Sequence, residues 1–89
     1  MITDKKVKPL SNLRLSDSRI RLETRVESPE FISIERGSVG DVVEVRNNEA
    51  KISYFLKQPG RNQFGLLQLN SVFFWVKNED FRSMFEYAS

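Results

Sequence analysis

The chain contains 89 residues, of which 39% are hydrophobic and 29% charged, and its formal net charge is +2. A chain of this length forms one domain and keeps much of its surface in water, which argues against a roomy enzyme with a deep pocket. Because cysteine and histidine are both absent, disulfides, thiolate nucleophiles and the usual zinc ligands are excluded. We therefore expect a protein that is not an enzyme and that holds no cofactor or metal.

Residues 1–17 carry four Lys or Arg side chains and show no apolar periodicity. Chain termini that are not tied down usually fray, so we predict that this segment is a basic, partly disordered N-terminal arm. Two other interpretations remain open. Leu13 and Leu15 could dock onto the body of the protein, and the basic arm could contact phosphate or an acidic partner.

Strict alternation of apolar and polar residues begins at Arg19 and predicts a strand to Glu27 with one buried and one wet face. Ser28–Pro29 ends this strand, because proline donates no ladder hydrogen bond. A long connection leads to a second strand, Val39–Arg46, in which Gly40 favours a bulge or a sharp bend. Asn47–Asn48 predicts a hairpin turn.

The second half of the chain predicts three further strands and a helix. The first strand spans Ala50–Lys57, and the stretch KQPGRNQFG, residues 57–65, predicts a hairpin loop because it contains Pro-Gly. Alternation resumes at Phe64, and Asn70–Ser71 marks a tight turn before the strand Val72–Lys77. The acidic pair that follows Asn78, Glu79–Asp80, is typical of the first turn of a helix rather than of a metal site.

These elements predict a mainly β protein: a small five-stranded antiparallel barrel at residues 18–77 with a short C-terminal helix at residues 78–89 packing on it. The stretch IERGSVGDVVEV, residues 34–45, places two glycines before a valine-rich strand and resembles SH3-like barrels of the KOW and Tudor kind. The resemblance covers roughly Arg19 to Lys77 in arrangement. No signature of the peptide-binding SH3 domains is visible, so the resemblance implies a fold and no particular ligand.

The alternation assigns thirteen apolar residues to the inner face of the predicted barrel. They are Ile20, Leu22, Val26, Val43, Val45, Ile52, Tyr54, Leu56, Leu67, Leu69, Val72, Phe74 and Val76.

Three aromatic residues fall on the opposite, nominally wet face: Phe55, Phe73 and Trp75. Either the C-terminal helix folds over them as a second small core, or they stay exposed as a contact surface. The adjacent loop adds Arg61, Asn62 and Gln63, and Lys57 precedes it. These seven residues, Phe55, Phe73, Trp75, Lys57, Arg61, Asn62 and Gln63, form the predicted binding site.

We expect this site to bind another protein, with the chain acting as a small accessory, adaptor or inhibitory subunit, and a homodimer remains possible. The alternative is a barrel that binds RNA or single-stranded DNA, because Lys51, Lys57, Arg61 and Lys77 flank aromatic residues. The longest apolar run, Val72–Val76, is far shorter than the roughly 20 residues that span a bilayer, and no signal peptide is visible. We therefore expect a soluble, cytoplasmic protein without a membrane partner.

Overall fold

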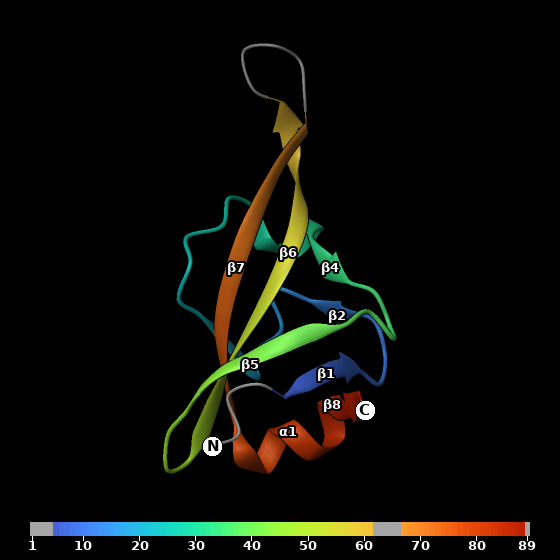
Figure 1. Cartoon of the computed structure of the whole chain (residues 1–89). Helices are drawn as coiled ribbons and strands as arrows, with labels where there is room; N and C mark the ends of the chain where they lie inside the picture. The colour runs from blue at the N-terminus through green and yellow to red at the C-terminus, as the bar shows by residue number, and fades with distance from the viewer. Residues whose placement is uncertain (1–4, 62–66, 89) are drawn as a thin grey trace.

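The computed structural model describes residues 5–61 and 67–88, and side chains at residues 5–56 and 71–88 (Figure 1). The chain is mainly β, with one short α-helix. Six antiparallel strands form one sheet in the order β3-β7-β6-β5-β1-β8, and β2 and β4 form a two-stranded sheet. The elements are β1 (Lys6–Pro9), β2 (Leu13–Arg14), β3 (Ile20–Leu22), the 3-10 turn η1 (Pro29–Phe31), β4 (Ser33–Ile34), β5 (Gly40–Val45), β6 (Glu49–Arg61), β7 (Leu67–Lys77), α1 (Asn78–Met84) and β8 (Phe85–Ala88). The sheets are not closed into a barrel.

The N-terminal segment belongs to the fold, which corrects the prediction of a separate arm at residues 1–17. β1 lies between β5 and β8 and pairs with both, and Val7 in its middle is fully buried. Leu13 and Leu15 are also buried, as the docking alternative proposed. A four-residue strand is fixed by backbone hydrogen bonds to its two neighbours, so it leaves almost no periodic signal in the sequence. Residues 1–4 lie outside the described part of the chain.

The hairpin at Asn47–Asn48 is confirmed, because the Arg46 N–H donates to the Glu49 carbonyl at 2.8 Å across the predicted turn. The tight turn predicted at Asn70–Ser71 is wrong, because β7 runs through both residues. Their partners on β6 continue the ladder without a break, and pairing along the neighbouring strand outweighs the local turn preference of Asn and Ser.

The stretch KQPGRNQFG is divided between a strand and the undescribed tip. Residues 57–61 belong to β6, which continues through the Pro-Gly pair with one irregularity in its pairing to β7 between Gln58 and Arg61. Residues 62–66 lie outside the described part of the chain, so the predicted loop there and the predicted strand start at Phe64 are not addressed.

Gly40 lies where the sheet needs a residue without a side chain. It is buried, and a Cβ atom there would collide with the ring of Tyr54. Just beyond it the pairing of β5 with β6 shifts register between Val42 and Glu44. The bulge turns Val42 into the core, whereas Val43 and Val45 are 37% and 39% exposed. The assignment of these two valines to the core was wrong, because a bulge breaks the period of two on which it depended.

The core lies inside the curled sheet and is closed by α1 and by the β2–β4 sheet. Phe74 is fully buried at its centre, with its ring centroid 6.3 Å from those of Tyr54 and Phe85. The helix begins at Asn78 and carries Glu79 and Asp80 in its first turn, as predicted. It ends at Met84, and residues 85–88 form β8, so the prediction of a helix at residues 78–89 was too long.

Most of the remaining inner-face assignments are confirmed. Ile20, Ile52, Tyr54, Val72, Phe74 and Val76 are buried, and Leu22, Val26 and Leu56 pack against them. The side chains of Leu67 and Leu69 lie outside the described part. Core residues that the alternation did not identify are Val7, Leu13, Leu15, Ile32, Ile34, Val42, Met84 and Phe85.

The β6–β7 hairpin extends past the rest of the sheet (Figure 1). Among the described residues, β5 pairs with β6 only as far as Ser53, and β3 pairs with β7 only as far as Phe74. Beyond these residues the two long strands pair with each other alone. The fold therefore presents a two-stranded ribbon, with Phe55 near its base.

Candidate functional site

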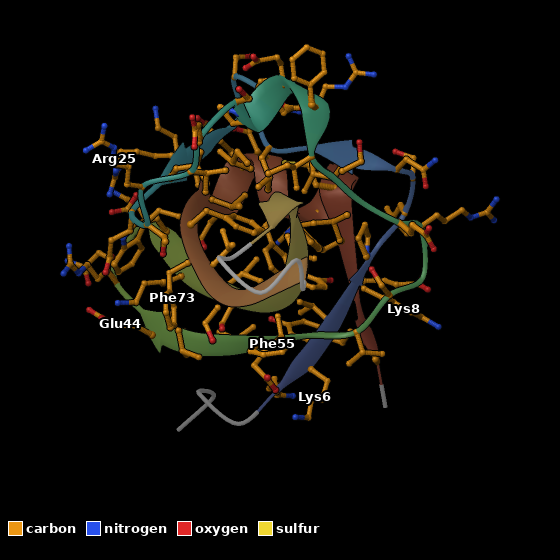
Figure 2. All side chains as sticks on the ribbon, turned by 90° about the horizontal axis from the view of Figure 1, so that it is seen from above. Lys6, Lys8, Arg25, Glu44, Phe55 and Phe73 are labelled. Atoms are coloured by element: carbon orange, nitrogen blue, oxygen red, sulfur yellow. The ribbon has the colours of Figure 1, made fainter. Side chains whose placement is uncertain are left out.

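The candidate site lies on the outer face of the sheet, where the odd-numbered residues of β6 and β7 meet. Three cross-strand pairs define it: Lys51 opposite Trp75, Ser53 opposite Phe73, and Phe55 opposite Ser71. In Figure 2, Phe73, Phe55 and Lys6 follow one another along the lower half of the view. The structure thus places Phe55, Phe73 and Trp75 on one face, as the alternation predicted.

Trp75 is buried on this face under charged side chains and is only 5% exposed. The guanidinium of Arg46 lies 4.3 Å from the centroid of the indole ring, and the Lys51 ammonium lies at 5.4 Å. Arg21 adds a third cation at 5.8 Å. Cations over an aromatic face are attracted by the ring quadrupole, so these side chains cover the indole favourably. The indole N–H donates a hydrogen bond to Glu23 at 2.8 Å.

Carboxylates balance the cations around Trp75. Lys51 bridges Glu23 and Glu44, at 3.3 and 3.4 Å, and Arg46 pairs with Glu44 at 3.0 Å. A bidentate contact joins Arg21 to Glu49, with both N···O distances at 3.0 Å. We call the set of Trp75, Arg21, Glu23, Glu44, Arg46, Glu49 and Lys51 the tryptophan cluster.

Two carboxyl groups of the tryptophan cluster have lowered pKa values. The hydrogen bond from Trp75 is the main cause at Glu23, whose pKa is also lowered by Lys51. At Glu49 the bidentate contact with Arg21 lowers the pKa of the carboxyl and raises that of the guanidinium. Both directions favour the charged forms, so the cluster keeps its ion pairs at neutral pH.

The sequence left open whether the C-terminal helix covers the three aromatic residues of this face or whether they stay exposed. For Trp75, the tryptophan cluster shows that neither alternative is correct. The C-terminal helix does not cover Trp75, because α1 packs on the core through Met84, on the opposite side of the sheet. Trp75 is not an exposed contact residue either. Charged residues on or directly after β3 and β5, together with Lys51 on β6, cover it, which removes Trp75 from the predicted binding surface.

Phe55 and Phe73 remain as the accessible aromatic residues of the predicted site. Phe55 is 66% exposed, and Phe73 is half-buried, with the Lys51 ammonium 5.6 Å from its ring. Each ring faces a serine across the hairpin, Ser71 or Ser53, which is too small to cover it. We call these four residues the Phe55 surface.

The other predicted site residues lie on the ribbon beyond Phe55. Lys57 and Arg61 belong to β6, so Arg61 is a strand residue and not part of a loop. Asn62 and Gln63 lie outside the described residues. The structure therefore continues the Phe55 surface into a ribbon whose sequence carries Lys57 and Arg61.

Within residues 5–61 and 67–88, no group of three or more carboxylates lies close enough to hold a metal ion. Burial raises the pKa of Tyr54 to about 12, and its hydroxyl donates to the Ser38 carbonyl at 2.8 Å, so this phenol serves the core. No helix in the described part is long and apolar enough to cross a membrane.

The sequence interpretation missed the partners of Trp75. Arg21 and Glu23 lie on the polar side of the alternation that begins at Arg19, but nothing in that pattern indicates that they gather with Arg46 around one ring. The charged alternation of residues 19–27 was the available signal. It needed the strand order, in which β3 lies beside β7 and places Arg21 opposite Trp75.

Comparison with known proteins finds no matching family model, no similar curated protein and no similar solved structure.

Proposed function

We propose that the protein is a non-catalytic protein-binding module whose contact surface is centred on Phe55. The observation that carries this proposal is the 66% exposure of Phe55 on a paired strand, beside the half-buried Phe73. An aromatic side chain held on a rigid strand loses little conformational freedom on binding, which makes it a suitable interface anchor. Lys57 and Arg61, farther along β6, are proposed to supply polar contacts at the rim.

The charges around the Phe55 surface favour a protein partner over nucleic acid. Lys6 pairs with Asp41, and Lys51 pairs with two carboxylates of the tryptophan cluster. A protein binds nucleic acid when its Lys and Arg side chains neutralise phosphates and release the counterions that had neutralised them. The ammonium groups of Lys6 and Lys51 already have carboxylate partners within the protein. A protein partner needs no excess positive charge, so the mixed charge of this face suits it better.

Binding of RNA or single-stranded DNA remains the second candidate. Phe55 and Phe73 could stack bases, with Lys57 and Arg61 contacting phosphates. Such binding would weaken steeply with added salt, unlike association with a protein through an aromatic anchor.

We also propose that the fold is related to the SH3-like barrels, with sheets that are not closed. Five consecutively paired strands, β8-β1-β5-β6-β7, support this proposal, as do the long connection between β1 and β5 and the short helix before β8. The stretch that carries the resemblance, residues 34–45, places Gly37 and Gly40 before the valines of β5. These five strands differ from the five that the alternation predicted, because β1 and β8 replace two of them.

The test compares Phe55→Ser with a matched control, Phe31→Ser. Phe31 is 79% exposed on η1, outside the six-stranded sheet, so its replacement removes a similar ring without touching the Phe55 surface. A photo-crosslinking residue at position 55 identifies the partner, and calorimetry with the purified partner then measures affinity. We expect Phe55→Ser to weaken binding at least tenfold and Phe31→Ser to leave it unchanged.

Two results would contradict the proposal. Equal affinities of the two variants and the wild type would remove Phe55 from the interface. Binding of a labelled single-stranded oligonucleotide that is lost in Phe55→Ser and weakens steeply between low and high salt would favour the second candidate.

A further inference from the structure

The outer edge of β7 presents free backbone groups in the part that extends past β3. The Phe73 N–H donates to the Thr24 hydroxyl at 2.9 Å, and the Phe73 carbonyl accepts from the Glu23 N–H at 2.9 Å. The peptide groups of Phe73 therefore point away from β6. Because this direction alternates along an antiparallel strand, the peptide groups of Ser71, Leu69 and Leu67 point the same way.

These three residues have no strand beside them on that edge. In the described part of the chain, β3 ends at Leu22, and Phe73 is the last residue of β7 whose backbone groups are bonded on this side. Three successive sets of N–H and C=O groups are thus available to a further strand. Such an edge is a template for strand addition.

The two edges of the ribbon differ in how they discourage strand addition. On β6 the sequence has Lys57, Pro59 and Arg61, and the pairing is irregular between Gln58 and Arg61, all of which hinder an added strand. On β7 the run Leu67–Val72, LQLNSV, has no charge, proline or glycine. Because the β6 edge is protected and the β7 edge is not, the β7 edge is expected to bind a partner strand.

We propose that a second copy of this chain pairs with this edge of β7, antiparallel and around a two-fold axis at Leu69. An uncharged edge can meet itself without like-charge repulsion, which a two-fold interface requires because each residue faces its own copy or a near neighbour. The β6–β7 ribbons of the two copies would form one continuous four-stranded sheet.

The number of free outward-pointing peptide groups selects the register. With the axis at Leu69, Leu69 meets its own copy and Leu67 meets Ser71, so every outward-pointing residue faces another. An axis at Asn70 would instead place Leu67 opposite Phe73, whose peptide groups are already bonded, and would leave only Leu69 and Ser71 to pair with each other. Each outward pair exchanges two hydrogen bonds, which gives about six across the interface.

The proposed interface is small, so the dimer forms in a concentration-dependent manner. About six new backbone hydrogen bonds correspond to a dissociation constant between roughly 1 µM and 1 mM. The interface uses the backbone edge of β7 at Leu67, Leu69 and Ser71 and not the aromatic rings of the Phe55 surface, so it does not depend on the proposed function.

The first experiment measures self-association of the full-length chain by sedimentation equilibrium and traps it with an engineered cysteine. The chain has no cysteine of its own, so Leu69→Cys carries a single thiol. Across the proposed axis the two Cα atoms at position 69 would lie about 5.5 Å apart, within the range that a disulfide spans. We expect Leu69→Cys to form a disulfide dimer at least tenfold faster than the exposed control Phe31→Cys.

The second experiment removes the edge without removing the hairpin. In Leu69→Pro the lost N–H is one that points away from β6, so the ribbon keeps its internal pairing. We expect this variant to be monomeric at concentrations where the wild type dimerises, with an unchanged circular dichroism spectrum. Should Leu69→Pro fail to fold, Leu69→Lys serves instead, because it places two like charges opposite each other.

Several results would overturn the proposal. They are a wild type that stays monomeric up to about 1 mM, equal disulfide rates in Leu69→Cys and Phe31→Cys, and dimers that persist in Leu69→Lys. A monomeric wild type whose β7 edge is occupied by a strand of a different protein would also overturn it. Phe55→Ser should still dimerise, so loss of the Phe55 function and loss of the dimer can be distinguished.

Discussion

Replacement of Trp75 by alanine tests whether the tryptophan cluster is a structural unit. The indole is only 5% exposed, and a buried tryptophan removes up to about 250 Å² from water. At roughly 25 cal/mol per Å² this burial contributes at most about 6 kcal/mol, and measured replacements of buried Phe or Trp by Ala cost about 3–5 kcal/mol. Because flexible Arg and Lys side chains cover the ring and can relax, we expect the lower end, about 3 kcal/mol.

This loss is large for a domain of 89 residues, whose total stability is of the order of 4–13 kcal/mol. Urea denaturation followed by circular dichroism measures it without needing the tryptophan signal. The control is Phe55→Ala, an aromatic residue on the same face that is 66% exposed, and its cost should stay below about 1 kcal/mol.

Fluorescence of the wild type provides an independent check of the same reasoning. Trp75 is the only tryptophan, so the emission reports on one site. We expect a blue-shifted maximum that acrylamide quenches weakly. An emission typical of tryptophan in water, or equal stabilities of Trp75→Ala and Phe55→Ala, would refute burial of Trp75 beneath the charged side chains.

Three further outcomes are expected. Gly40→Ala should destabilise the protein by about 1–3 kcal/mol in urea denaturation, since its Cβ would force the Tyr54 ring out of place, and a change below about 0.5 kcal/mol would contradict that contact. The pKa values of Glu23 and Glu49 are lowered in the fold, so their contribution to stability is present above their unfolded pKa near 4.5 and is lost as the pH falls through their folded values. The melting temperature should therefore drop as the pH is lowered from about 6 to about 3, and Glu23→Gln should reduce that drop; an identical pH profile in the variant would count against the linkage. Leu15→Ala should cost about 2–5 kcal/mol in denaturant unfolding because Leu15 is only 2% exposed, whereas an unchanged midpoint would restore the interpretation of residues 1–17 as a separate arm.

The alternation of apolar and polar residues correctly predicted which side chains at the centre of the sheet face the core. Ile52 and Phe74 were assigned to the core and are fully buried, and Phe55 was assigned to the outer face and is exposed. These residues lie on strands long enough for alternation to show which side faces the core. The same reasoning failed at Val43, because the bulge beside it adds a residue that the pattern does not record.

The sequence by itself determined a small, mainly β chain without cysteine or histidine chemistry, because composition and alternation depend on local residue types alone. Strand order needed the tertiary structure. It makes β1 and β8 neighbours and brings Arg21 on β3 against Trp75 on β7, across more than fifty residues of chain. Strand order decides which distant segments form hydrogen bonds and which charged side chains gather over one ring. A local pattern of residue types does not contain the strand order.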